Sequence, residues 1–253
     1  MTGRFKIWLR LTLEDIKFRI REVVRRGLRK LVEIAITDLD LMGSFRDIAS
    51  SADFEREHLA QAARFKGRSQ LFRYALDQVG SNDGLFLEFG VYKGDSINRL
   101  AGLKQGVRWY GFDSFVGLPE DWTLGARKGA FSIGGKLPPV RGNVTLIKGL
   151  FEQTLPSFAV EHRGSKVVFM HIDCDLYSAT RTIFSALGDM LRPGSIVVFD
   201  EFINYPGWQN GEYRAFMEFI GESKRSFEYI GYVRTGGQVA VKAELAPGAT
   251  HLR

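Results

Sequence analysis

The chain has 253 residues, of which 45% are hydrophobic and 25% charged, so it can bury one full core with an extension. Its single cysteine, Cys174, excludes an intrachain disulfide, and no apolar run is long enough to span a membrane. The first residues lack the uninterrupted apolar core of a signal peptide, so we expect a cytoplasmic protein.

The net charge of +6 is unevenly distributed. Residues 1–30 hold ten Lys/Arg and three acids, so they carry +7 and the remainder carries −1. Residues 5–34 read as a basic helix with an apolar stripe of Ile7, Leu11, Ile16, Ile20, Val24, Leu28 and Leu31. Such a helix can lie on a membrane, contact nucleic acid, or pack on another subunit or its own core. We favour packing, and expect a homo-oligomer, no nucleic-acid partner and at most weak membrane-surface contact through residues 1–30.

The domain division predicted from the sequence is an N-terminal basic helical extension over 1–66 and a catalytic domain over 67–253. Residues 53–80 carry further helical pattern that ends at Gly80, before the turn sequence SNDG. From Leu85 onward strand and helix patterns alternate, which predicts an α/β fold with a mainly parallel sheet.

The first strand–helix turn of this region has the features of a ligand site. Gly90 and Gly94 lie between a buried strand at 85–90 and a helix that begins near Ser96. Glycines there let a ligand approach the backbone, and the helix start offers free amide donors. The turn lacks the GxGxxG set that a dinucleotide pyrophosphate requires. Glu88, at the strand end, would attract an ammonium or sulfonium group.

A second strand at 107–112 ends in Asp113, nineteen residues after Gly94. An acid at this place can accept hydrogen bonds from both ribose hydroxyls. The first βαβ unit therefore reads as a nucleoside site without a phosphate clamp, which fits S-adenosylmethionine better than NAD.

Two loops and one further strand complete the candidate cavity. Residues 114–142 are rich in Gly and Pro and longer than a plain connection, so they form either a lid or substrate loop or a flexible surface loop. Strand Val144–Lys148 is followed by Gly149-Leu150-Phe151, where adenine could meet the backbone and an aromatic ring. In residues 202–212, Tyr205 and Trp208 either stack on a ring of the acceptor or pack as ordinary surface aromatics.

Four acids follow two apolar runs near the end of the fold. Val167–Met170 leads to Asp173 and Asp175, and Ser195–Phe199 leads to Asp200 and Glu201. The helix between them has Ile183, Leu187 and Leu191 as its buried stripe, so the two runs should form parallel neighbouring strands. Carboxylates this close need protons or a cation, and Mg²⁺ prefers carboxylate oxygen.

Plainer interpretations exist for these acids and for their neighbours. Asp175 could cap the following helix, and Asp200 and Glu201 could be solvated loop acids. Cys174 lies between two acids that disfavour its thiolate, so it is not a nucleophile. His171 is expected to be a packed, hydrogen-bonded residue beside the acids, and His162 a loop residue. Residues 227–233 and 238–242 predict a closing antiparallel hairpin.

The motifs FLEFGVYKGDS, GFDSFVGLPEDW, KGLFEQTLP, HIDCDLYSAT and GSIVVFDEF, in this order, resemble the TylF/macrocin O-methyltransferase family over about residues 68–243. The resemblance implies a doubly wound, seven-stranded Rossmann-like methyltransferase sheet, mostly parallel with an antiparallel last strand, preceded by N-terminal helices. It implies an S-adenosylmethionine- and Mg²⁺-dependent enzyme that methylates a hydroxyl of a small-molecule acceptor, a sugar of a natural product or glycan.

By the same resemblance, site residues can be assigned. Those at the cofactor would be Glu88, Gly90, Tyr92, Gly94, Ser96, Asp113, Ser114, Gly149, Phe151 and Asp173. The metal ligands would be Asp173, Asp200 and Glu201, and Asp175 would be the general base that takes the proton of a hydroxyl bound to Mg²⁺. The family usually carries two aspartates where this chain has Asp200-Glu201, so Glu201 is expected to bind differently or through water.

Two other functions are consistent with the sequence. One is a catechol-type O-methyltransferase acting on an aromatic vicinal diol. The other is a binding protein that uses its basic arm and keeps a vestigial cofactor fold. Retention of four acids and Asp113 argues against the second.

Overall fold

A computed structural model describes residues 2–122 and 125–244, with side chains from residue 19 onward. It divides into two compact units, Met1–Arg46 and Asp47–Arg253. Residues 47–66, which the sequence assigned to the extension, are thus part of the second unit. The residues that line the main cavity all follow residue 66, so the proposal that the catalytic domain begins at residue 67 stands as a functional division.

The first unit is helical, as predicted. Helix α1 (Thr2–Thr37) is followed by α2 (Leu39–His58), whose first turn is capped by the Asp38 carboxylate, which accepts a hydrogen bond from the amide of Leu41 at 2.9 Å. The described part of the apolar stripe is exposed to solvent: Ile20, Val24, Leu28 and Leu31. The side chains of Ile7, Leu11 and Ile16 lie outside the described residues. Within the described chain, none of the helices is both long and apolar enough to cross a membrane.

The second unit is an eight-stranded sheet in the order β1-β7-β8-β6-β5-β2-β3-β4. β8 runs antiparallel to β6 and β7, and the other pairings are parallel, which confirms the predicted α/β class and the closing hairpin. The strands are β1 (Ala63–Phe65), β2 (Leu85–Phe89), β3 (Trp109–Asp113), β4 (Val144–Lys148), β5 (Val167–Ile172), β6 (Leu191–Phe199), β7 (Ser226–Val233) and β8 (Val239–Glu244).

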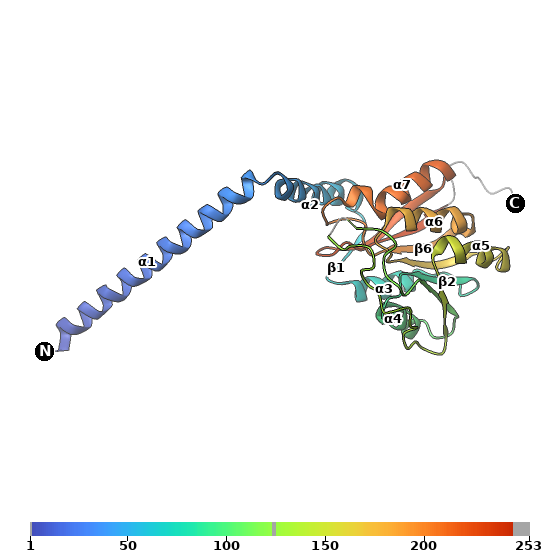
Figure 1. The fold of residues 1–253 in the computed structure, drawn as a ribbon, viewed down its shortest axis with the longest axis horizontal. Coiled ribbons are helices and arrows are strands. Elements are labelled where there is room, and N and C mark those ends of the chain that lie inside the picture. Colours follow the sequence, from blue (N-terminus) through green and yellow to red (C-terminus); the bar gives the residue numbers. More distant parts are fainter. Residues whose placement is uncertain (1, 123–124, 245–253) are drawn as a thin grey trace. The chain divides into compact units, whose positions relative to one another are not determined.

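Helices cover both faces of this sheet, so the fold is doubly wound (Figure 1). On one face lie α3 (Arg68–Asp77) and α4 (Asp95–Leu103). On the other lie α5 (Phe151–Glu161), α6 (Tyr177–Leu187) and α7 (Glu212–Ser223). The apolar runs in β2, β5 and β6 are buried on both faces, which is the pattern of central parallel strands.

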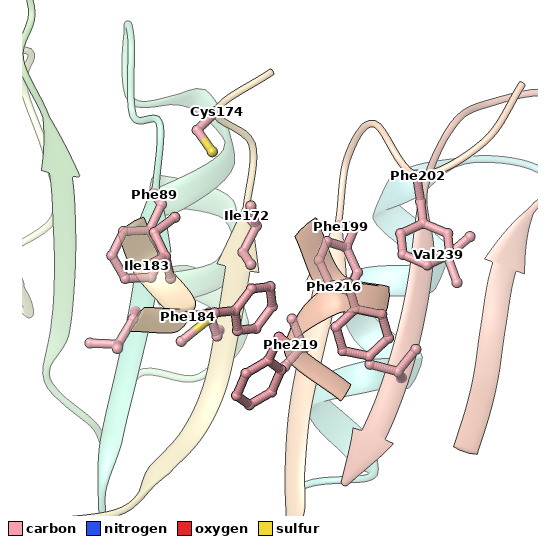
Figure 2. Packing of buried hydrophobic residues seen from close by; sticks show 14 of the residues in the cluster. Phe89, Ile172, Cys174, Ile183, Phe184, Phe199, Phe202, Phe216, Phe219 and Val239 are labelled. Atoms are coloured by element: carbon pink, nitrogen blue, oxygen red, sulfur yellow. The ribbon is translucent and has the colours of Figure 1, made fainter. Parts of the chain in front are cut away.

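Aromatic side chains fill the layer between the sheet and the second helix group. Figure 2 shows Phe184 of α6 and Phe219 of α7 packed together beside Ile172 and Phe199 of the neighbouring strands β5 and β6. The rings of Phe184 and Phe219 stack with centroids 4.6 Å apart. This packing fixes the crossover helix α6 against the two strands whose ends carry the acids.

Three details differ from the sequence expectations. The strand count is eight instead of seven, because β1 has three residues and pairs only with the distant β7. β1 also interrupts the helical pattern expected over 53–80. Leu191 does not belong to the crossover helix, which ends at Leu187; after a turn of 3₁₀ helix Leu191 begins β6 and pairs with Val167.

Candidate active site

A cavity of about 590 Å³ opens at the carboxyl ends of the parallel strands, where open α/β sheets bind ligands. Most of the residues proposed from the sequence line it: Gly90, Tyr92, Ser96, Asp113, Ser114, Gly149, Phe151, Asp173, Asp175 and Glu201. Three of the proposed residues, Glu88, Gly94 and Asp200, are not part of its wall. Arg68 and Trp122, which the sequence did not single out, line it as well.

Gly90 is required by the approach of two strand ends. Its φ is +87°, and a Cβ placed on it would lie 1.6 Å from the carbonyl oxygen of Asp173. The amide of Asp173 in turn donates to the carbonyl of Phe89 at 2.8 Å. Glycine therefore lets the end of β2 lie directly against the end of β5, and this brings the nucleotide-type turn next to the acids.

Asp113 occupies the predicted end of β3 and reaches the cavity, but its carboxylate is already engaged. One oxygen, Oδ2, accepts hydrogen bonds from the amides of Val91 at 2.9 Å and Tyr92 at 2.7 Å. The other, Oδ1, accepts from the amide of Phe115 at 2.7 Å. Two carboxylate oxygens offer about four acceptor positions, so a further donor can still be bound. Asp113 thus shapes the turn after β2 and also presents a negative charge to the cavity.

Glu88 does not border the cavity, which corrects the sequence expectation. It is fully buried; its Oε1 accepts from the Ser96 hydroxyl at 3.0 Å, and its Oε2 lies 3.0 Å from His171 Nδ1. Side chains alternate along a strand, and Glu88 is paired with His171 in the β2–β5 register, so both face α3 and α4. Burial raises the pKa of Glu88, although the bond to His171 opposes this.

His171 is buried and hydrogen-bonded, as predicted. Its Nε2 lies 3.7 Å from Asp200 Oδ1, beyond hydrogen-bond distance, and has no hydrogen-bond partner among the described residues. Burial lowers the pKa of His171, but Asp200 and Glu88 outweigh that effect and raise it to about 10. His171 is therefore buried between two carboxyl groups that favour its charged form.

Asp200 does not line the cavity; its carboxylate lies beside Arg68 and His171. Its Oδ1 lies 3.5 Å from Arg68 Nη1, and the same nitrogen lies 3.8 Å from Asp173 Oδ2. Burial works to raise the pKa of Asp200, but His171 and then Arg68 hold it below its ordinary value. Asp200 is therefore buried and paired, not the solvated loop acid of the plainer interpretation.

Glu201 faces the cavity beside a second buried acid that the sequence did not reveal. Glu212, at the start of α7, is fully buried and accepts hydrogen bonds from the amides of Cys174 at 3.4 Å and Glu201 at 3.2 Å. Glu212 thus links the ends of β5 and β6. Burial, followed by the neighbouring acid Asp173, raises the pKa of Glu201 and of Glu212 well above the ordinary value. Oε2 of Glu201 is buried without a hydrogen-bond partner in the described chain.

Asp175 lies at a strained turn. Its φ is +64°, and the amide of Leu176 donates to the carbonyl of Cys174 at 2.6 Å across it, which is a γ-turn of the uncommon positive-φ kind. Leu176, not Asp175, occupies the N-cap position of α6, so the capping interpretation is not supported. Burial, with a contribution from Asp200, raises the pKa of Asp175 to about 7. Strained residues of this kind are concentrated at functional sites.

Two overlapping groups of these side chains could hold a metal ion. Asp173, Asp175 and Glu201 form an all-oxygen group, and His171, Asp173 and Asp200 form another; within each group the ligand atoms lie within 4.8 Å of one another. Only Asp173 belongs to both. The predicted trio of Asp173, Asp200 and Glu201 is therefore divided, because Asp200 turns toward Arg68 and His171. The all-oxygen group lines the cavity and includes the unpartnered Oε2 of Glu201, which fits Mg²⁺.

The loop over residues 114–142, of which 123–124 are not described, contributes Trp122 to the cavity wall. Its Glu120 accepts a hydrogen bond from Ser178 on α6, which ties the loop to the site. Tyr205 packs against Trp122 with ring centroids 6.0 Å apart, but Tyr205 and Trp208 are both buried. Trp208 donates its Nε1 hydrogen to the carbonyl of Asp47 at 2.8 Å. The packing interpretation holds for these two aromatics.

The remaining two side chains agree with a structural role. Burial, followed by the charge of Glu212, raises the pKa of the Cys174 thiol well above its ordinary value, so the thiolate is disfavoured. His162 lies at the end of α5 and packs on Phe158 with ring centroids 4.2 Å apart.

Comparisons with known proteins agree with this geometry. Residues 87–202 match a family model described as a methyltransferase domain. No curated protein matches the chain in sequence. Among solved structures, CalS11, a calicheamicin methyltransferase, is similar with 24% identity and a TM-score of 0.59, over 69% of this chain and 78% of that one.

The O-methyltransferase NovP is similar with 19% identity and a TM-score of 0.54, over 70% of this chain and 80% of that one. An apo structure of CalS11, described as a TDP-rhamnose 3′-O-methyltransferase, gives 22% identity and a TM-score of 0.52, over 69% of this chain and 78% of that one. Residues 87–202 are thus similar to a methyltransferase domain, and the fold of the chain is that of these O-methyltransferase structures.

Proposed function

We propose that this chain is an S-adenosylmethionine-dependent O-methyltransferase of the TylF/macrocin type that methylates a hydroxyl of a sugar in a natural product or glycan. The observation that carries the proposal is the composition of one cavity. It joins the turn after β2, the Asp113 carboxylate and the acids Asp173, Asp175 and Glu201 in a single wall. A binding protein with a vestigial site would have no reason to keep these groups together.

In the proposed complex, S-adenosylmethionine would supply a methyl group carried on a sulfonium. The Asp113 carboxylate would accept hydrogen bonds from the ribose hydroxyls, and Gly149 and Phe151 would border the adenine. Glu88 would act indirectly, because it orients the hydroxyl of Ser96, which does reach the cavity.

Asp175 is the proposed general base. A carboxyl with a pKa of about 7 can both accept a proton and be present as carboxylate at neutral pH. It would take the proton of the acceptor hydroxyl as that oxygen forms its bond to the methyl carbon and the carbon–sulfur bond breaks. The γ-turn around Asp175 holds this side chain at the cavity rather than at the helix cap.

Mg²⁺ is proposed as a second cofactor. The chain's own residues suit it: Asp173 and Glu201 offer carboxylate oxygens beside Asp175, and the buried acids here outnumber Arg68 and His171. When bound, the ion would act as a Lewis acid that lowers the pKa of a hydroxyl. Asp200 is proposed to orient the site through Arg68 and His171.

A sugar acceptor is favoured over a catechol because one of the similar structures is described as a TDP-rhamnose 3′-O-methyltransferase. The test is methyl transfer from S-adenosylmethionine to panels of nucleotide sugars, glycosides and catechols, with product masses recorded. The proposal expects one methyl group added to a sugar and an equal amount of S-adenosylhomocysteine. Turnover restricted to catechols would favour the rival substrate class.

The metal requirement is tested separately from the acceptor. EDTA should abolish turnover, added Mg²⁺ should restore it, and calorimetry should detect Mg²⁺ binding that Asp173→Asn removes. Full methyl transfer in chelator would refute the metal proposal and leave the methyltransferase proposal intact.

A further inference from the structure

Exposed apolar side chains follow one another along α1, far in sequence from the cavity. From residue 19 onward, its large apolar side chains are exposed: Val23 is 69%, Leu28 57%, Leu31 64% and Ile34 57% accessible. Single exposed apolar residues need no explanation, but a continuous row along one helix does.

Five of the exposed apolar side chains lie on one face of α1, whereas Val32 and Ile36 lie outside that face. Ile20, Val24, Leu28, Leu31 and Ile34 follow one another at intervals of three and four residues, and an α-helix turns about 100° per residue. They therefore form one stripe, which we call the apolar face. Arg26 and Arg29 project from the opposite side, and Arg21 and Lys30 border the apolar face on its two sides.

The polar side of α1 carries a net positive charge. Between residues 19 and 36 there are six basic side chains, Arg19, Arg21, Arg25, Arg26, Arg29 and Lys30, against two acids, Glu22 and Glu33. Glu22 makes an ion pair with Arg25 at 3.7 Å. The segment thus combines an apolar face with a surplus of positive charge, which is the composition of helices that lie in a membrane interface.

We propose that α1 is an interfacial helix that attaches this protein to an anionic lipid bilayer surface. In this arrangement the apolar face enters the boundary between headgroups and acyl chains, and the basic side chains bind anionic headgroups. The helix lies on the membrane and does not cross it. The proposal is independent of the chemistry assigned to the cavity.

Two other binding partners would each match only one side of the helix, either the apolar face or the basic side. A second copy of α1 would cover the apolar face, but it would bring like charges together, because Arg21 and Lys30 border the contact. Nucleic acid would neutralise the basic side but leave Leu28 and Leu31 in water. An anionic bilayer suits both faces at once.

The test is co-sedimentation of the full chain with phosphatidylcholine vesicles, with and without phosphatidylglycerol, over a range of salt concentrations. The chain should bind the phosphatidylglycerol vesicles, less at high salt, and bind neutral vesicles much more weakly. The double variant Leu28→Glu, Leu31→Glu should lose binding. A matched control, Val160→Glu with Met217→Glu, places the same two charges on exposed apolar residues of α5 and α7 and should bind as the wild type does.

Charge is tested with a triple variant, Arg21→Gln, Arg26→Gln and Lys30→Gln. Each basic residue near an anionic surface contributes about 1 kcal/mol, so partitioning should fall about 100-fold. The control removes three exposed basic residues of the second unit: Arg73→Gln, Arg99→Gln and Arg127→Gln. Circular dichroism of each variant checks that it is folded.

Several results would overturn the proposal. Equal binding to neutral and anionic vesicles, or unchanged binding of Leu28→Glu, Leu31→Glu, would exclude it. A dimer in sedimentation velocity that this double variant dissociates, without vesicle binding by the wild type, would assign the apolar face to a second copy. Salt-dependent binding to duplex DNA without vesicle binding would assign the basic side to nucleic acid.

Discussion

Replacing Asp175 with asparagine should lower activity and raise stability at the same time. The change keeps the shape of the side chain, and asparagine tolerates the positive φ of this turn. It removes the group that we propose takes the acceptor's proton, so turnover should fall by about 10²–10⁴-fold. It also removes a carboxylate that is buried among other acids, and this should favour folding.

The size of the stability gain follows from the pKa of Asp175. The value rises from 3.8 to about 7 on folding, and one unit corresponds to about 1.4 kcal/mol, so the charged form costs at most about 4 kcal/mol. A carboxyl with a raised pKa in the folded state costs nothing below about pH 4, where it is protonated in both states. The cost grows between about pH 4 and pH 7 and is constant above. Neighbouring acids would share part of it, so we expect a gain of roughly 2 kcal/mol.

The assay is urea unfolding of wild type and Asp175→Asn in EDTA at about pH 4 and pH 8, beside methyl transfer with Mg²⁺. The two proteins should be equally stable at the lower pH, and the variant more stable at the higher one. Asp77→Asn, the same change at an exposed position of α3, is the control and should alter neither property. Turnover within about threefold of wild type would remove Asp175 as the base. An activity loss repaired by excess Mg²⁺ would make it a metal ligand.

Three other substitutions test the site. Gly90→Ala should destabilise the fold by at least ~3 kcal/mol in urea unfolding, because the new Cβ would meet the carbonyl of Asp173, whereas Gly106→Ala, with nothing within 4 Å, should be tolerated. Trp122→Ala should raise KM for the acceptor about tenfold in steady-state kinetics and leave S-adenosylhomocysteine affinity unchanged; the reverse pattern would place this ring at the cofactor. Arg68→Ala should lower the free energy of unfolding in EDTA by about 1 kcal/mol, because the acids Asp173 and Asp200 lose a paired cation. Mg²⁺ should then raise the Tm of this variant more than that of the wild type, and an equal rise would contradict this.

The sequence predicted those parts of the fold that depend on local pattern. Buried apolar runs followed by a glycine or by acids identified β2, β5 and the end of β6, and the crossover rule made the last two parallel neighbours. The three-residue β1 has no periodicity to detect, because its place depends on pairing with β7. Leu191 was assigned to the helix since its spacing from Leu187 suits a helix as well as a new strand.

The sequence predicted where along the chain the site residues lie, but not toward which face of the sheet their side chains point. Strand parity turns Glu88 and His171 toward α3 and α4, and the sequence alone did not reveal this because the strand is apolar on both faces. Arg68 and Glu212 were missed for another reason. Arg68 lies 132 residues before Asp200, and Glu212, although only 11 residues after Glu201, is separated from it by a loop. Only the tertiary fold shows that these two side chains reach Asp200 and Glu201.

The claim that the cavity is a cofactor site is tested most directly by titrating the chain with S-adenosylhomocysteine in a calorimeter. We expect one binding site per chain, and an affinity about 30–150-fold lower for Asp113→Ala, because a hydrogen bond to a charged acceptor contributes about 2–3 kcal/mol. Asp113→Ala also loses three backbone hydrogen bonds, so its folding is checked by thermal unfolding at the titration temperature. No heat from the folded wild-type chain would show that the cavity does not bind the cofactor, and equal affinity in the folded variant would remove Asp113 from the cofactor site.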